Sequence, residues 1–163
     1  MPRIVLFQPQ IPPNTGNVAR TCAATAQELH LVEPLGFSIN DRTLRRAGLD
    51  YWPYVPLHRH ADWPAFLSCR TDRGGRLIAL SAQAQLPYTG FRFQADDWLL
   101  FGRESDGLPA EVTAEASTCL TIPMRRPRQH PDGGVRSLNL SVSVGVVLFE
   151  ALRQLDLPEP GTL

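Results

Sequence analysis

The sequence contains no lysine: all sixteen basic residues are arginine, and sixteen acidic residues balance them over 163 residues. The absence excludes a Schiff-base lysine, a lysine general base and a lysine-bearing phosphate loop. Cysteine is also scarce. The three cysteines, Cys22, Cys69 and Cys119, are odd in number and far apart in the sequence. Such spacing offers no disulfide framework, and it predicts a protein of the reducing cytoplasm.

Long apolar segments are absent as well. No run approaches the length of a membrane span, and the N-terminal residues enter a strand-like run without the layout of a signal peptide. Hydrophobic residues make up 43% of the chain and charged residues 20%, which is ordinary for a globular protein. We therefore expect one domain over residues 1–157, with a short tail at residues 158–163.

Segments typical of strands alternate with segments typical of helices. Strands are predicted at residues 3–7, 29–32, 54–57, 77–80, 98–101 and 119–122. Helices are predicted after a proline-rich loop, capped by Asn14-Thr15, at 42–47, at 62–68, after Pro109, and from about 138 to 155. Several strands are apolar at successive positions, as in sheets covered on both faces. The pattern predicts an α/β fold, a parallel sheet flanked by helices.

The last predicted helix is apolar nearly all round. Its first stripe consists of Leu140, Val144, Val147, Ala151 and Leu155. Its second stripe consists of Val142, Val146, Phe149 and Leu152. A helix of this kind needs cover on more than one side. One side can pack on the sheet, and the other predicts a homodimer interface, with burial inside the monomer as the alternative.

Four loops that follow strands hold most of the candidate binding groups: residues 8–17, 81–85, 102–107 and 125–139. Because ligands of open parallel sheets bind outside the carboxyl ends of the strands, we expect these loops to form the site. In the first, Asn14 and Asn17 can donate and accept hydrogen bonds, and Arg20 can take a phosphate bidentately. The alternative is a capped helix with a solvated arginine.

The sequences of the other loops do not decide which ligands they bind. No Gly-Lys-Ser/Thr follows Gly102 and Gly107, and no G-x-G-x-x-G follows a strand, so nucleotide-binding fingerprints are missing. Glu104 and Asp106 could hold a cation, face a cationic ligand, or be solvated acids of a turn. Ser137 can cap the long helix and leave backbone N–H groups for a ligand, or act as a cap alone.

Positive charge is concentrated in two places on this neutral chain. Residues 125–136 contain Arg125, Arg126, Arg128 and Arg136, and a second cluster lies at Arg42, Arg45 and Arg46. A local basic loop fits an anionic partner bound at one place. The alternative is a solvated loop.

His58 and His60 alternate along one segment, so on a strand they would share one face. No third ligand stands at a suggestive spacing, and the sequence therefore predicts no metal site.

Four of these segments also form an ordered set. They are Asn-Thr-Gly-Asn-x-x-Arg at 14–20, Phe-Gly-x-Glu-Ser-x-Gly-Leu-Pro at 101–109, Ile-Pro-Met at 122–124, and Ser-Leu-Asn-Leu-Ser at 137–141. Together they resemble the motifs of the SPOUT superfamily of RNA methyltransferases. Glu-Pro-Leu-Gly-Phe at 33–37 and Leu-Arg-Arg-Ala-Gly-Leu-Asp-Tyr at 44–51 narrow the resemblance to the tRNA (cytidine/uridine-34)-2′-O-methyltransferase (TrmL-like) family, over residues 3–157.

The resemblance implies a SPOUT fold whose C-terminal part forms a deep trefoil knot. It implies a homodimer through the last helix, the tRNA anticodon stem-loop as partner, and S-adenosyl-L-methionine as methyl donor without a metal. The residues matching the donor pocket are Leu80, Gly102, Leu108, Ile122, Met124, Ser137, Leu138 and Ser141.

The resemblance also assigns roles in the transfer of a methyl group to a ribose 2′-OH. Arg20 matches a catalytic residue; because a guanidinium stays protonated, we expect it to orient the phosphate and stabilise developing alkoxide charge. Supporting catalytic positions are Asn14, Glu104, Ser137 and Asn139. The alternatives are methylation of another RNA ribose and an RNA-binding protein that has lost catalysis.

One departure from the family pattern is the longer, basic link between Ile-Pro-Met and Ser-Leu-Asn. We expect this insertion, residues 125–135, to add phosphate contacts that steepen the salt dependence of binding. The predicted RNA-binding residues are Arg20, Arg125, Arg126, Arg128 and Arg136. The alternative is a tolerated, disordered insertion.

Overall fold

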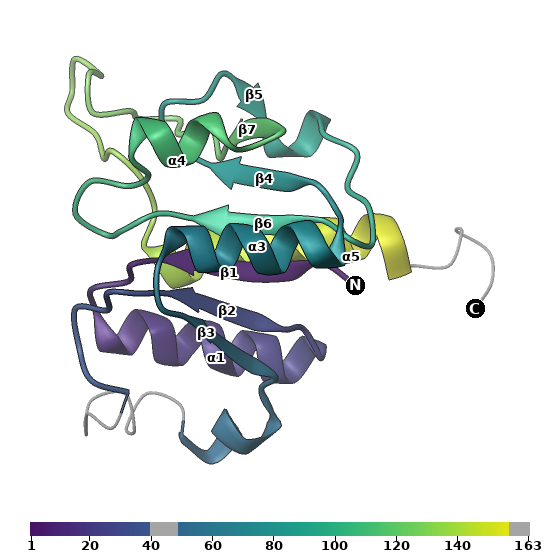
Figure 1. Cartoon of the computed structure of the whole chain (residues 1–163). Helices are drawn as coiled ribbons and strands as arrows, with labels where there is room; N and C mark the ends of the chain where they lie inside the picture. The colour runs from purple at the N-terminus through teal and green to yellow at the C-terminus, as the bar shows by residue number, and fades with distance from the viewer. Residues whose placement is uncertain (40–48, 157–163) are drawn as a thin grey trace, which may run out of the picture.

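The computed structural model describes residues 1–39 and 49–156. Within those ranges one parallel sheet has seven strands in the order β3-β2-β1-β6-β4-β7-β5 (Figure 1). The strands are β1 (Arg3–Phe7), β2 (Leu29–Val32), β3 (Leu57–His60), β4 (Leu77–Leu80), β5 (Leu86–Pro87), β6 (Trp98–Phe101) and β7 (Thr118–Thr121). The predicted parallel α/β fold is confirmed. The trefoil knot stays a prediction.

Helices cover both faces of the sheet, as the apolar strands predict. They are α1 (Pro12–Thr25), α3 (Trp63–Arg73), α4 (Ala110–Ala114) and α5 (Leu140–Asp156), with the 3-10 turns η1 (Leu49–Tyr54) and η2 (Tyr88–Gly90). Ile4 and Leu6 of β1 are buried in a core shared with α1 and α5. Val5 and Phe7 point the other way, into a core shared with α3 and α4. The alternation follows from the two-residue period of a strand.

Two helix starts differ from the prediction. Asn14-Thr15 does not cap α1, because the helix already begins at Pro12 with Ile11 at its N-cap. Proline is accepted in a first turn, where its missing N–H has no intrahelical partner to lose. Ser137 does not cap α5; Asn139 does, since its Oδ1 accepts from the backbone N–H of Ser141 at 2.9 Å.

The predicted strand at 54–57 is also wrong in position. Residues 49–54 form η1, and the strand runs from Leu57 to His60 at an edge of the described sheet. Its side chains are half exposed, so it lacks the continuous apolar run of a central strand. The two-residue strand β5 was not predicted.

Some predictions fall outside the described residues. These are the helix at 42–47, with Arg42, Arg45 and Arg46, and the tail at 158–163. Among the helices in the described ranges, none has both the length and the apolar character needed to cross a bilayer.

The two apolar stripes of α5 have different surroundings. In the first stripe, Val144, Val147 and Ala151 are fully buried against the sheet. In the second stripe, Val142 is 50% exposed and Phe149 is 58% exposed. Among the described residues, the chain's own fold therefore leaves much of the second stripe uncovered.

Candidate active site

The four loops predicted to form the site meet around one cavity of about 560 Å³. They follow β1, β4, β6 and β7, so the cavity lies at the carboxyl ends of these strands, as expected for an open parallel sheet. Its lining includes Asn14, Ser81, Gly102, Glu104, Arg128 and Asn139. A cavity of this size suits a small organic ligand.

Most residues that match the donor pocket of the resembling family line this cavity. They are Leu80, Gly102, Leu108, Ile122, Met124, Ser137 and Leu138. Ser141 is not in the lining. Its hydroxyl donates to Asn139 Oδ1 at 2.8 Å, so the structure gives it a role in the first turn of α5.

Gly102 shows why the loop after β6 begins with glycine. Arg103 and Gly107 exchange two backbone hydrogen bonds of 3.0 Å, which fold the loop back on itself. A Cβ atom on Gly102 would lie 2.3 Å from the carbonyl carbon of Gly107 and 2.5 Å from the nitrogen of Leu108. Only glycine permits this close approach of backbone to backbone at the cavity wall.

The Glu104 carboxylate joins this loop to the loop that follows β1. It accepts from the backbone N–H groups of Gln10 at 2.8 Å and Ile11 at 3.1 Å, and from Asn14 Nδ2 at 3.2 Å. For Glu104, the alternative that it is only a solvated acid of a turn is therefore wrong. Because the carboxylate is engaged with protein donors, its observed role is to hold the loop of residues 10–14.

Asn14 and Asn139 extend the connection to the third motif. Asn139 Nδ2 donates to Asn14 Oδ1 at 2.8 Å, while Asn139 Oδ1 accepts from the N–H and hydroxyl of Ser141. Each amide is thereby fixed in orientation, since its oxygen accepts and its nitrogen donates. The chain of hydrogen bonds Glu104–Asn14–Asn139–Ser141 links three motifs. The bond between Asn14 and Glu104 spans 90 residues of the sequence, and the bond between Asn14 and Asn139 spans 125.

Arg136 closes the same junction from the basic loop. Its guanidinium donates to the carbonyl oxygens of Ser105 at 2.9 Å and Glu104 at 3.1 Å. Gln10, which sequence reasoning missed, accepts from the Ser105 N–H through its side chain at 3.1 Å. No spacing signal marks it, because its partner is 95 residues away.

The Asp106 carboxylate is paired with an arginine of its own loop. The Arg103 guanidinium binds both of its carboxylate oxygens at 2.7 Å, and the Ser105 hydroxyl adds a bond of 2.8 Å. Arg103 first, and then Ser105, hold the pKa of the Asp106 carboxyl below its usual value. Arg103 also donates to Gln8 Oε1 at 2.8 Å, which ties the loop to the end of β1.

The predicted RNA-binding arginines lie in different positions relative to the cavity. Arg128 and Arg136 line the cavity, whereas Arg125 and Arg126 are exposed beside it. Arg20 is exposed on α1 and is not among the residues that line the cavity.

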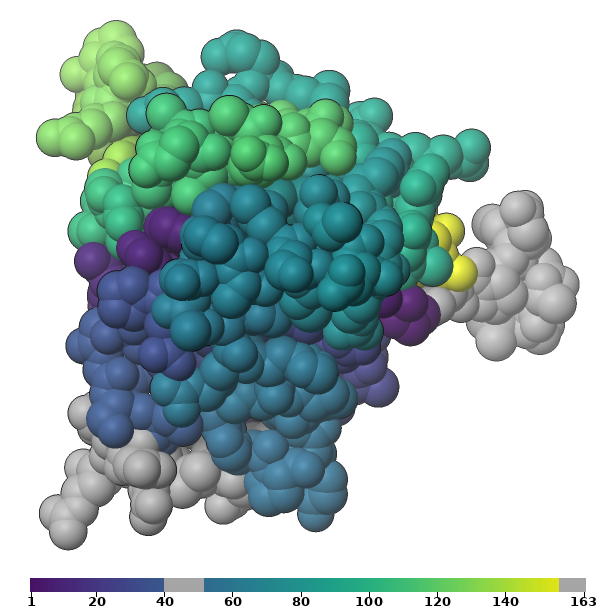
Figure 2. All heavy atoms as spheres, viewed as in Figure 1, coloured from purple at the N-terminus to yellow at the C-terminus, as the bar shows by residue number. Residues whose placement is uncertain are grey.

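The basic insertion has internal structure. The Val135 N–H donates to the Arg126 carbonyl at 3.1 Å, and Pro127 and Val135 form a parallel bridge. A Cβ atom on Gly134 would lie 2.2 Å from the Pro127 carbonyl oxygen, so the two arms of the loop touch. In Figure 2 this segment, in light green, projects from the body of the molecule.

Comparison with known proteins agrees with this architecture. The SpoU rRNA Methylase family matches residues 1–149. A protein of Synechocystis named putative tRNA (cytidine(34)-2′-O)-methyltransferase is 50% identical over 155 residues, covering 95% of this chain and 97% of the relative.

Solved structures are similar over the same length. One, described as giving structural insights into the 2-OH methylation of C/U34 on tRNA, has a TM-score of 0.86 and 51% identity, covering 95% of this chain and 96% of that one. An AdoMet-bound rRNA methyltransferase from Sinorhizobium meliloti has a TM-score of 0.82 and 27% identity, covering 94% of this chain and 56% of that one. With the motifs joined at one cavity, these matches show that the chain belongs to the SpoU rRNA Methylase family.

Proposed function

We propose that the protein transfers a methyl group from S-adenosyl-L-methionine to the ribose 2′-OH of the wobble nucleotide of tRNA, cytidine or uridine at position 34. The observation that carries this proposal is the 50% identity, over nearly the full length of both chains, to a relative named for that reaction. The joined Glu104–Asn14–Asn139 chain supports it, because it holds three motif loops together around one cavity.

The cavity fits the proposed methyl donor. Its volume of about 560 Å³ lies in the range of small-molecule sites, and apolar side chains such as Leu80, Ile122 and Met124 stand beside polar groups. The glycine at position 102 lets the backbone form one wall. The donor supplies an already activated methyl group on its sulfonium, so no metal is needed for the transfer.

The chain's own residues would bind and orient the reactants. Asn139 and Glu104 fix the loops around the donor, and Arg128 and Arg136 place positive charge at the cavity, where a phosphate of RNA would arrive. We assign to Arg20 the orientation of the substrate phosphate and the stabilisation of developing charge on the 2′-oxygen.

Nucleoside mass spectrometry tests the proposal directly. Unmodified tRNA incubated with the protein and methyl-deuterated S-adenosyl-L-methionine should yield a labelled 2′-O-methylated nucleoside at position 34. The same tRNA with a 2′-deoxynucleotide at position 34 is the matched control and should stay unlabelled. Label in ribosomal RNA or at another tRNA position would instead support methylation of a different ribose.

The basic insertion predicts a change in salt dependence. Replacing Arg125, Arg126 and Arg128 by alanine should weaken tRNA binding and reduce the slope of log affinity against log salt by about 2, because each phosphate contact releases a counterion. Filter binding between low and moderate salt measures the slope. Arg59→Ala with Arg92→Ala is a control on other exposed arginines. An unchanged slope in the triple variant would mean that the insertion does not touch RNA.

The exposed stripe of α5 supports a homodimer through this helix. Val142 and Phe149 together leave an apolar surface that a second copy would cover. Phe149→Asp should convert a dimer of twice 18.1 kDa into monomers, as measured by light scattering after gel filtration. Tyr54→Asp is the control, because Tyr54 is a 73% exposed aromatic residue that belongs to η1 and not to α5. A wild-type protein that is already monomeric would contradict the assignment.

We also infer a cytoplasmic location. Cys22, Cys69 and Cys119 are free in the structure, as expected in a reducing compartment. The proposed tRNA substrate is consistent with the same compartment.

A further inference from the structure

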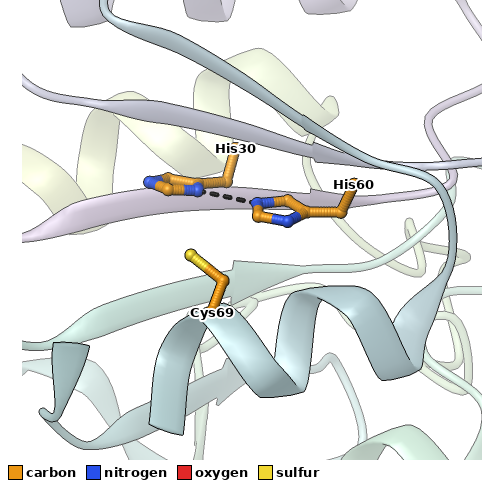
Figure 3. Close-up of side chains that lie close together, drawn as sticks. All are labelled: His30, His60 and Cys69. Atoms are coloured by element: carbon orange, nitrogen blue, oxygen red, sulfur yellow. Dashed lines mark hydrogen bonds between the residues drawn. The ribbon is translucent and has the colours of Figure 1, made fainter. Parts of the chain in front are cut away.

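Three potential metal ligands meet on the face of the sheet that α3 covers. Nδ1 of His30, in β2, lies 2.9 Å from Nε2 of His60, in β3, and Cys69 of α3 points toward the pair (Figure 3). One ligand atom from each residue lies within 4.8 Å of the other two. The sequence suggested no third ligand for His60, because its partners come from 30 residues before it and from the next helix.

The three side chains are of the types that zinc prefers. In a tetrahedral site with metal–nitrogen bonds of 2.0–2.1 Å, two imidazole nitrogens stand about 3.3 Å apart, so the histidine pair would open by only ~0.4 Å. The thiol would approach by at most about 1.3 Å to reach its bonding distance. We infer that His30, His60 and Cys69 form a binding site for one divalent transition-metal ion of the zinc type, remote from the cavity.

The surroundings prepare His30 as a ligand. Its Nε2 lies 3.1 Å from Glu28 Oε2, so Nε2–H donates to the carboxylate and leaves the lone pair on Nδ1, facing His60. A histidine held by a carboxylate on its far nitrogen is the usual arrangement behind a bound metal. Burial lowers the pKa of His30 to about 3 and lowers that of His60, so both rings are neutral at pH 7.

Metal binding would follow a simple proton balance. The Cys69 thiol releases one proton to solvent, and the proton of His60 Nε2 moves to Nδ1. The rings of Trp98 and Phe66 lie beside the histidines, at 4.8 Å from His30 and 5.4 Å from His60. This apolar shell limits the access of bulk water to the metal–ligand bonds, and one water molecule would complete the tetrahedron.

A competing cluster shares His30 but is less suited to a cation. Glu28, His30 and His58 also bring ligand atoms within 4.8 Å. However, the Arg73 guanidinium already binds both Glu28 oxygens, at 2.7 and 2.8 Å, so an ion placed there would have to displace it. Arg73 also interacts with Cys69, so its positive charge alone does not separate the two clusters. The cysteine-containing set lies on the other side of the His30 ring and keeps the Glu28–Arg73 pair intact.

The proposed ion would join two neighbouring strands and a helix. His30 belongs to β2, His60 to the edge strand β3, and Cys69 to the helix that follows. A bond network across them would clamp α3 to the edge of the sheet. We therefore expect about 100 µM Zn²⁺, added to protein stripped with a chelator, to raise Tm by roughly 5–10 °C if its Kd is near 1 µM.

Titration of the full-length, chelator-stripped protein with Co²⁺ tests the site without reference to activity. One equivalent should produce the visible bands of tetrahedral cobalt and a near-ultraviolet thiolate-to-metal charge-transfer band, and one equivalent of Zn²⁺ should remove both. Cys69→Ser should abolish the charge-transfer band and weaken Zn²⁺ binding by at least about 10-fold.

Two matched variants separate the alternatives. Cys119→Ser changes another half-buried cysteine and should leave the cobalt spectrum unchanged. His58→Gln should also leave it unchanged, because His58 belongs only to the competing cluster. Binding that survives Cys69→Ser but is lost in His58→Gln would overturn the proposal, as would wild-type protein that gives no cobalt spectrum. Circular dichroism of each variant confirms that the fold is retained.

Discussion

Replacing Arg20 by alanine is expected to reduce methyl transfer to tRNA at least about 100-fold, the usual loss when a donor to developing charge is removed. Arg20 is exposed on α1 and does not line the donor cavity, so the same variant should bind S-adenosyl-L-methionine within about two-fold of wild type. Single-turnover kinetics with labelled donor measures the first quantity, and calorimetry measures the second.

The combination of the two measurements makes the Arg20 result decisive. Arg59→Ala is the control, since Arg59 is an exposed arginine of β3, two strands from β1, and pairs with Glu33. If Arg20→Ala loses donor binding, Arg20 supports the cavity and our assignment is wrong. If turnover persists, another group stabilises the 2′-oxygen.

Replacing Gly102 by alanine is expected to weaken donor binding roughly 100-fold while the protein stays folded. The new Cβ atom would stand 2.3 Å from a backbone carbon of Gly107, and backbone cannot swing aside as a side chain can. The loop must shift, and a shift of about 1 Å at a binding site costs roughly 100-fold in affinity or rate. The strain should lower stability by about 1–3 kcal/mol.

Gly90→Ala is the matched control for this change. Gly90 is exposed, and no atom lies within 4 Å of the Cβ position, so the same methyl group enters open space. We expect its stability to change by less than about 0.5 kcal/mol and its donor affinity to remain that of wild type. Normal donor binding by Gly102→Ala would show that the wall of residues 102–108 is not part of the donor site.

The sequence predicts the centre of this fold better than its edges. Strands at 3–7, 29–32, 77–80 and 98–101 coincide with β1, β2, β4 and β6, because each is mostly apolar and is buried on both faces. The edge strand β3 was misplaced, since its exposed residues His58 and Arg59 carry no apolar signal. Burial, rather than intrinsic propensity, made the central strands recognisable.

The candidate site was likewise predictable only in part. Topology alone predicts that four loops meet, because the carboxyl ends of parallel strands lie at one edge. It does not predict that Glu104 bonds to Asn14 or that Asn139 bonds to both Asn14 and Ser141, since these partners are set by folding over 90 residues and more. The cluster of His30, His60 and Cys69 was not predicted, for the same reason.

The place of β6 in the sheet has a consequence for biosynthesis. β6 lies between β1 and β4, and Arg3–Leu6 pair with Trp98–Phe101, more than 90 residues later. While the ribosome is still making the second half of the chain, β1 has β2 on one side and an open edge on the other. Contacts of such long range slow folding, and an open apolar edge invites association with other chains. We therefore expect the open edge of β1 in the nascent protein to need protection from other chains until about residue 101 has emerged from the ribosome.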